Sequence, residues 1–255
     1  MENAALISMC DTYLGKVLDL MDEQDMWDDT LLIVCTDHGF LLGEHDWWAK
    51  CVQPFYGEVA HTPLFLWDPR TGRKSERNHA LVQNIDWGPT LLEAFGVPRT
   101  PDMQGIPLTY SVASDVPLRE GVLFGLHGGH VNVTDGRYVC MRAPTTAENW
   151  PLYEYTLMPT HMRHTFDVSE LQETEMAAPF DFTKGCPVMR IPARGSGWPD
   201  MHRFGTLLFD LQNDPTQEHP LDDPEIEARM TRLMVNLMKA NDAPVEQFER
   251  LGLTV

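Results

Sequence analysis

A carboxylate and an imidazole stand next to each other directly after a short apolar segment. Residues 30–35 are apolar and rich in strand formers, and Thr36-Asp37-His38-Gly39 follow them. Asp37 and His38 could together offer an oxygen and a nitrogen to a divalent cation. A hard cation such as Ca²⁺ takes about six to eight oxygen ligands, so this pair cannot complete a site. On the residues alone, an Asp that caps a turn beside a hydrogen-bonded His is the commoner explanation.

Two further side chains downstream could act on an anionic substrate. Lys50 follows a loop dense in Trp and His and could serve as a point charge for such a substrate. His61 could donate a proton or contact an oxyanion. A purely structural contact of His61 before Pro63 is an equally good explanation. These residue types therefore indicate that the chain acts on an anion, but they do not define the reaction.

The elements around these residues follow the pattern of an α/β fold. Apolar spacing predicts an amphipathic helix over residues 4–21. The run 30–35 predicts a strand buried on both faces, and 64–67 predicts a second strand. Residues 85–95 fit a short helix that ends at Gly96. Helices alternating with strands, and polar residues at a strand end, are typical of ligand sites in α/β sheets.

The pattern changes after about residue 110. Three short strands are expected at 122–126, 131–134 and 137–142, followed by an irregular segment at 143–203. A fourth strand is expected at 207–211, and a helix from Asp223-Pro224 onward. Asp135-Gly136 between two of the strands predicts a hairpin. We therefore expect two units: 1–110, an α/β part, and 111–255, a small α+β subdomain of antiparallel strands and one helix with an irregular insertion at 143–203.

Composition excludes several classes of partner. The 255 residues carry a net charge of −19, which disfavours nucleic acid and anionic membranes. No apolar run approaches the ~18–20 residues of a membrane span. Met1 is not followed by a secretory leader, which slightly favours the cytoplasm but leaves localisation open. The five cysteines are scattered and do not form a disulfide framework, so we expect buried free thiols.

Several motifs in order along the chain resemble one enzyme family. Thr36-Asp37-His38-Gly39 is followed by Leu42-Gly43-Glu44-His45, then Lys50, then Thr62-Pro63-Leu64 entering a strand. This order resembles type I sulfatases, hydrolases of the alkaline phosphatase superfamily. Flanking matches run from about residue 4 to about 240 and are weakest over 143–203. The resemblance implies a partial alkaline-phosphatase-like sheet covered by helices.

The resemblance also implies roles for particular residues. In sulfatases the positions matching Asp37 and His38 ligate a divalent metal, usually Ca²⁺. The position matching Lys50 contacts the sulfate, and His61 lies where several members have a substrate-side His or Arg. Glu44 and His45 match a recurrent loop and are expected to be architectural.

Half of the sulfatase constellation has no counterpart in this sequence. Sulfatases also use an Asp-Asp metal pair and a Cys-x-Pro-Ser-Arg segment whose Cys becomes formylglycine, and neither is present. Both would lie upstream, so we expect the chain to begin midway through the fold and to be inactive alone. Cys186-Pro-Val-Met-Arg190 has the wrong order to replace the segment. Unpaired strands would leave an exposed sheet edge, through which we expect self-association.

Three residues of the second unit are candidates for reading the substrate. His127 lies at a Gly-rich turn, and His161 and Arg163 lie close together in the expected insertion. A His beside an Arg could bind an anionic group, although ordinary loop positions are the commoner explanation.

We therefore expect a fragment of a sulfuric ester hydrolase that binds a small-molecule or saccharide sulfate ester. A phosphonate or phosphodiester hydrolase of the same superfamily and a non-catalytic binding module remain the alternatives.

Overall fold

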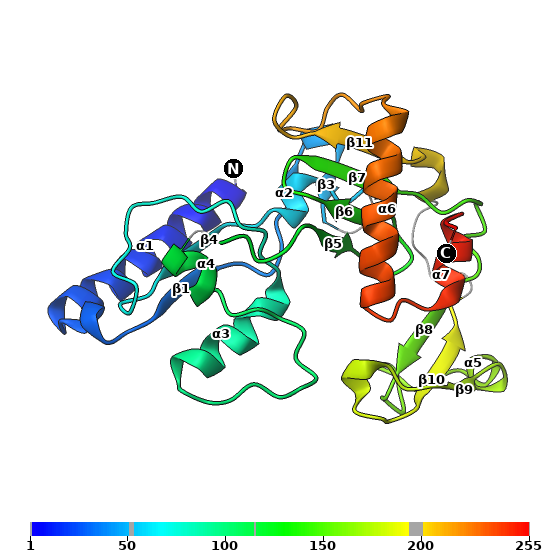
Figure 1. The fold of residues 1–255 in the computed structure, drawn as a ribbon, viewed down its shortest axis with the longest axis horizontal. Helices are drawn as coiled ribbons and strands as arrows, with labels where there is room; N and C mark the ends of the chain where they lie inside the picture. Colours follow the sequence, from blue (N-terminus) through cyan, green and yellow to red (C-terminus); the bar gives the residue numbers. More distant parts are fainter. Residues whose placement is uncertain (1, 51–53, 115, 194–200, 255) are drawn as a thin grey trace.

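The computed structural model describes residues 2–50, 54–114, 116–193 and 201–254 (Figure 1). Its first part contains α1 (Glu2–Glu23), β1 (Leu32–Cys35), β2 (Leu41–Leu42), β3 (Trp48–Ala49), α2 (Gly57–Ala60), β4 (Leu64–Trp67), α3 (Trp87–Ala94) and α4 (Thr109–Ser114). The second part contains β5 (Val122–Gly125), β6 (Val131–Thr134), β7 (Tyr138–Arg142), β8 (Tyr153–Thr156), α5 (Val168–Gln172), β9 (Glu175–Ala177), β10 (Val188–Pro192), β11 (Leu207–Asp210), α6 (Pro224–Ala240) and α7 (Val245–Arg250). The fold is mixed α/β, as the sequence predicts.

The strand that leads to the candidate site pairs with one other strand in the described chain. β1 and β4 run antiparallel, with Leu32 opposite Trp67 and Cys35 opposite Leu64. The prediction that β1 is buried on both faces is wrong here, since its residues are partly or fully exposed. Each strand of the described pair therefore keeps an edge with unpaired backbone groups.

The first helix leaves an apolar face uncovered by any described residue. The spacing over 4–21 correctly predicts α1, yet large apolar side chains along it are exposed: Leu6, Ile7, Met9, Tyr13, Val17 and Leu20. On β4, Phe65 is 66% exposed as well. Helices normally bury such a face against a sheet or another helix.

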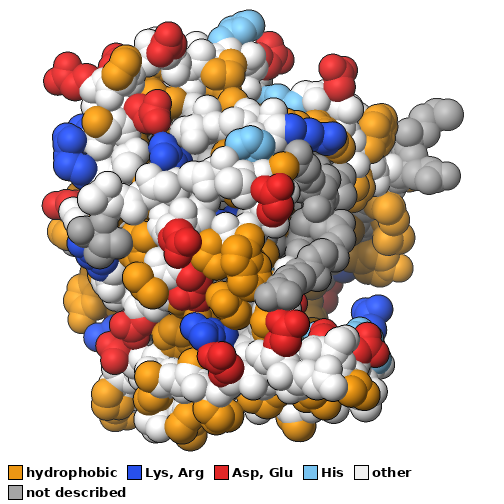
Figure 2. Space-filling model, turned by 90° about the vertical axis from the view of Figure 1, so that its right-hand side faces the viewer, with side chains coloured by type: hydrophobic (Ala, Val, Ile, Leu, Met, Phe, Trp, Pro, Cys, Tyr) orange, Lys and Arg blue, Asp and Glu red, His pale blue; other side chains and the backbone are white. Residues whose placement is uncertain are grey.

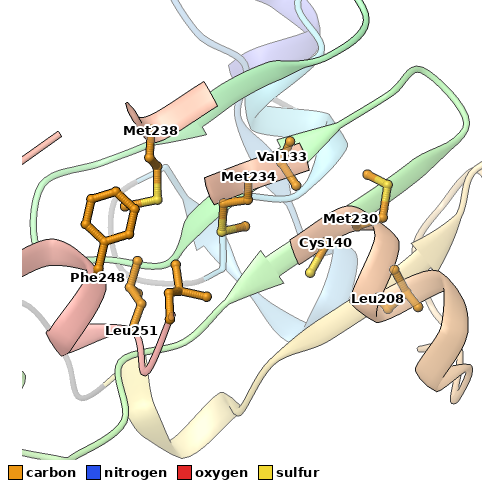
Figure 3. Close-up of a cluster of buried hydrophobic side chains, with 9 residues drawn as sticks. Val133, Cys140, Leu208, Met230, Met234, Met238, Phe248 and Leu251 are labelled. Atoms are coloured by element: carbon orange, nitrogen blue, oxygen red, sulfur yellow. The ribbon is translucent and has the colours of Figure 1, made fainter. Parts of the chain in front are cut away.

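The main core lies between α6 and a four-stranded antiparallel sheet. The sheet has the order β11-β7-β6-β5, and α6 crosses it. The buried cluster contains Val133, Cys140, Leu208, Met230, Met234, Met238, Phe248, Leu251 and Leu253 (Figure 3). Asp223 caps α6 by accepting hydrogen bonds from the Glu225 and Ile226 backbone N–H groups, as its sequence position predicts. The predicted hairpin joins β6 to β7 through Gly136, whose φ is 94°.

The segment expected to be irregular contains a sheet of its own. β8, β10 and β9 form three antiparallel strands, next to α5, in the lower right of Figure 1. The expectation of a structureless 143–203 is therefore wrong for the described part of that range. Tyr155 donates a hydrogen bond to the buried Glu246 at the start of α7, which attaches this sheet to that helix.

A buried ion pair connects the two parts of the chain. Both oxygens of Asp86 accept bonds from Arg119, at 2.7 and 2.8 Å. The same carboxylate accepts the backbone N–H groups of Gln83 and Ile106, each at 2.8 Å. Asp86 is fully buried, so these four bonds replace the water that the carboxylate loses on folding.

The described residues also show whether a helix could span a membrane and where the free cysteines lie. No helix among the described residues is long and apolar enough to cross a membrane. Of the cysteines, Cys51 lies outside the described residues and Cys140 is buried and free. The expectation of buried thiols is wrong for the exposed Cys10, Cys35 and Cys186. Figure 2 shows acidic side chains scattered among apolar ones on one face of the molecule.

Candidate metal and sulfate site

The end of β1 presents an ionised carboxylate to solvent. Oδ1 of Asp37 accepts a 2.9 Å bond from the His38 backbone N–H and a longer one, 3.3 Å, from the Thr36 hydroxyl. The His38 N–H bond is the main cause that lowers the pKa of Asp37, because it stabilises the charged form. The Asp37 side chain is 81% exposed. The second oxygen therefore remains available to a ligand.

The imidazole of His38 lies between a backbone carbonyl and this carboxylate. Nδ1 lies 2.9 Å from the Gly39 carbonyl oxygen, which can only accept, so Nδ1 donates a proton to it. Nε2, the other ring nitrogen, lies 3.3 Å from Oδ2 of Asp37. A hydrogen bond of this kind on the far nitrogen is the usual way to fix the tautomer of a metal-binding His.

Lys50 reaches the same point from β3. Its Nζ contacts Nε2 of His38. The ammonium therefore lies beside the side chains of Asp37 and His38. The structure thus brings three of the sequence-predicted site residues together.

The donor set fits a divalent cation only in part. One carboxylate oxygen and one imidazole nitrogen are suitable ligands for Ca²⁺ or a similar ion. However, no group of three or more His, Cys, Asp or Glu side chains within the residues described could hold a metal ion. The pair therefore accounts for part of a coordination sphere.

Gly39 ties this turn to the helix that precedes His61. Its backbone N–H donates to the Val59 carbonyl at 2.9 Å. A Cβ at Gly39 would lie only 1.7 Å from the Glu58 carbonyl oxygen, so the close approach requires glycine. His61 ends α2 and is exposed, with its backbone N–H donating to the Gly57 carbonyl at 2.8 Å.

A buried polar cluster, of which the sequence had indicated only His45, anchors the loop before Lys50. The ring of His45 stacks on Tyr56 at 3.7 Å, and its Nε2 lies 3.5 Å from Oε2 of Glu58. Burial raises the pKa of Tyr56. Gln217, from the second part, accepts the Gly57 backbone N–H at 2.6 Å. The Gly43-Glu44-His45 pattern was the sequence signal for this cluster. The stacking on Tyr56 and the contact with Glu58 give His45 the architectural contacts that the sequence predicted.

The three candidates of the second part lie elsewhere. Nε2 of His127 donates to the Tyr153 carbonyl at 3.1 Å. His161 pairs with Glu170 at 2.8 Å and packs on Phe166, with the exposed Arg163 close by in the chain. The β8–β10 region that carries His161 and Arg163 stands apart from β1 in Figure 1. No contact of these three side chains with Asp37 or Lys50 is found in the described parts of the chain.

The arrangement of these elements is that of known alkaline-phosphatase-like hydrolases. A structure solved in complex with D-glucosamine-2-N,6-O-disulfate superposes with a TM-score of 0.63 at 16% identity, covering 92% of this chain and 39% of that one. A phosphonate monoester hydrolase from Silicibacter pomeroyi gives a TM-score of 0.56 at 20% identity, covering 91% and 39%. These likenesses establish the class of fold.

Within that class the sequence matches sulfatases. Residues 3–97 match the sulfatase family model. An N-acetylglucosamine-6-O-sulfatase of Bacteroides thetaiotaomicron is 31% identical over 104 residues, which are 41% of this chain and 18% of that protein. The resemblance to sulfatases is therefore confirmed, and the chain spans less than half the length of the relatives it matches.

Proposed function

We propose that this chain contributes the metal-binding and sulfate-binding half of a sulfatase site. In this proposal Asp37 and His38 hold a divalent cation, Ca²⁺, and Lys50 binds the sulfate group of the substrate. A metal in that position would stabilise negative charge as the ester bond breaks. His61 would lie beside the leaving group, and His127, His161 and Arg163 would act at the far end of a larger substrate.

The convergence of three side chains on one point carries the proposal. Asp37 and His38 follow β1, Lys50 follows β3, and the three side chains lie next to one another. A positive charge stabilises the negative charge that develops on a substrate more strongly when the protein holds that positive charge in a fixed position. The sulfatase match over residues 3–97 supports the assignment of that anion as a sulfate.

The substrate class follows from the relatives. One curated relative is named for a sulfated amino sugar, and another, a choline-sulfatase of Rhizobium meliloti, for a small sulfate ester. We therefore propose a saccharide or small-molecule sulfate ester. Hydrolysis of a phosphonate or a phosphodiester is the second candidate function, because a phosphonate monoester hydrolase has a similar fold.

We also propose that this chain is catalytically incomplete and associates through its open surface. No segment of the sequence matches the formylglycine motif, and the described residues contain no group of three or more His, Cys, Asp or Glu side chains that could hold a metal ion. The exposed apolar side chains of α1 and the free edges of β1 and β4 form a surface suited to self-association.

Calcium titration by calorimetry tests the metal assignment. We expect roughly millimolar affinity for the purified chain, weakened about tenfold or more in Asp37→Asn, since the substitution removes the charged ligand. Asp46→Asn is the matched control, because Asp46 is exposed in the loop just before Lys50 and the charge change is the same. The same samples should release no sulfate from an aryl sulfate. Equal affinity in the two variants, or sulfate release above trace level, contradicts the proposal.

A further inference from the structure

The hairpin of β2 and β3 carries exposed apolar side chains just before Lys50. Leu42 and Trp48 are directly opposite in the antiparallel pair, which places their side chains on the same face. Trp48 is 65% exposed, and Leu42 is exposed beside it. A Cβ at Gly43 would lie 3.9 Å from Cζ2 of Trp48, so the edge of the indole reaches over the backbone of Gly43. The indole therefore offers a broad apolar surface to a ligand.

The two neighbouring tryptophans of this hairpin have different surroundings. Trp47 packs edge-on against Phe204, with ring centroids 6.1 Å apart, and so attaches the hairpin to the segment before β11. Within the described chain, the Trp48 ring makes no hydrogen bond and stacks on no other ring. In a ligand site, a tryptophan supplies a large rigid contact surface at a small cost in conformational entropy.

A carboxylate borders the surface formed by Leu42 and Trp48. Oε2 of Glu44 accepts the Leu42 backbone N–H at 2.5 Å, and this bond is the main cause that lowers the pKa of Glu44. The ionised side chain is exposed, and its other oxygen can accept a hydrogen bond from a ligand hydroxyl. An apolar surface bordered by an acceptor matches a pyranose ring, which has C–H groups on its faces and hydroxyl donors around its edge.

The same surface adjoins the ammonium of Lys50. Only Ala49 separates Trp48 from Lys50, so their Cα atoms lie within about 7 Å. One ammonium in a chain of net charge −19 attracts a monoanionic ester only weakly through solvent. Contacts with the rest of the substrate must therefore supply part of the affinity. Ligand sites commonly combine aromatic surface with a few polar groups in this way.

We propose that Trp48 and Glu44 form a sugar subsite beside Lys50, in which a pyranose ring stacks on the indole and one of its hydroxyl groups donates to Glu44. This inference rests on the proposed function and narrows its substrate to a saccharide sulfate ester. The sulfate group lies at Lys50, and the ring that carries it lies on Trp48. Trp48 then determines specificity, because it contacts the part of the substrate that distinguishes a sugar ester from a small acyclic one.

The affinities of Trp48 variants for two sulfate esters test the subsite. NMR titration gives dissociation constants for N-acetylglucosamine 6-sulfate and for methyl sulfate. Trp48→Leu should weaken binding of the sugar ester about five- to tenfold and leave that of methyl sulfate unchanged. Trp48→Phe, which keeps an aromatic face, should retain most of the affinity.

Phe95→Leu is the matched control for Trp48→Leu. Phe95 is 81% exposed directly after α3, which stands apart from β3 in Figure 1. Its loss removes an exposed aromatic side chain without touching the subsite, so the affinity for either ester should not change. Equal affinities of Trp48→Leu and Phe95→Leu for the sugar ester overturn the inference.

Lys50→Gln separates this inference from the proposed function. It should weaken both esters, since both carry the sulfate group. If it does so while Trp48→Leu weakens neither, the sulfate site stands and the sugar subsite is refuted. If the sugar ester depends on Trp48 but not on Lys50, the subsite stands and the role of Lys50 is wrong. Binding of neither ester overturns both.

The indole signals of the unmodified chain give an independent readout. Labelling with ¹⁵N-tryptophan yields an Nε1–H signal for each of the seven tryptophans, and the signal of Trp48 is the one missing in Trp48→Leu. The sugar ester should shift this signal more than that of Trp67, whose Nε1 donates to the Trp27 carbonyl. An unmoved Trp48 signal while another indole shifts overturns the inference.

Discussion

Replacing Gly39 with alanine is expected to lower the free energy of unfolding by about 3 kcal/mol. The new Cβ would lie 1.7 Å from the Glu58 carbonyl oxygen. The obstacle is backbone, so it cannot move aside as a flexible side chain does. Either the turn at Asp37 or α2 must shift, and the Gly39–Val59 hydrogen bond is lost with it. Calcium binding should weaken in parallel, since the turn positions Asp37 and His38.

Urea unfolding of Gly39→Ala and Gly88→Ala measures this effect against a matched control. Gly88 lies in α3, where an added Cβ meets nothing within 4 Å. There alanine should be neutral or stabilise by up to about 1 kcal/mol, because it favours the helix. If the two variants unfold at the same urea concentration, the close approach at Gly39 does not constrain the turn.

Asp86→Ala should destabilise the chain even more, by about 3–5 kcal/mol. The substitution leaves the Arg119 guanidinium, which is only 13% exposed, without its carboxylate. It also leaves the Gln83 and Ile106 backbone N–H groups without an acceptor. Because Asp86 joins the helix of the first part to the segment before β5, both parts should loosen together.

Equilibrium unfolding of Asp86→Ala beside Glu76→Ala checks this prediction. Glu76 pairs with Arg73 at the surface and is 51% exposed, so its loss should change stability by about 1 kcal/mol or less. Similar losses in the two variants would show that the buried pair does not hold the two parts together.

Elements with a clear local signal could be predicted from the sequence. The strands leading to Asp37 and to Asp68 are continuous apolar runs, and α6 begins at an Asp-Pro cap. The β8–β10 sheet could not be predicted in this way. Its strands mix charged and aromatic residues, and distant contacts stabilise them, such as Arg190 with Glu175 and Tyr155 with Glu246.

The candidate site shows the same division. The residue types of Asp37, His38 and Lys50 and their order could be read from the sequence, and the structure brings them together. The geometry of these side chains could not be predicted from the sequence, because Lys50 reaches His38 across a loop and the stacking of His45 on Tyr56 anchors that loop.

The most direct test of the central claim is to locate a bound divalent cation by NMR. Mn²⁺ added at a small fraction of the protein concentration broadens signals close to where it binds. We expect selective broadening of the His38 imidazole signals in the unmodified chain and its loss in Asp37→Asn. Unbroadened His38 signals, or stronger broadening at His161, would place the cation elsewhere and contradict the assignment of this site.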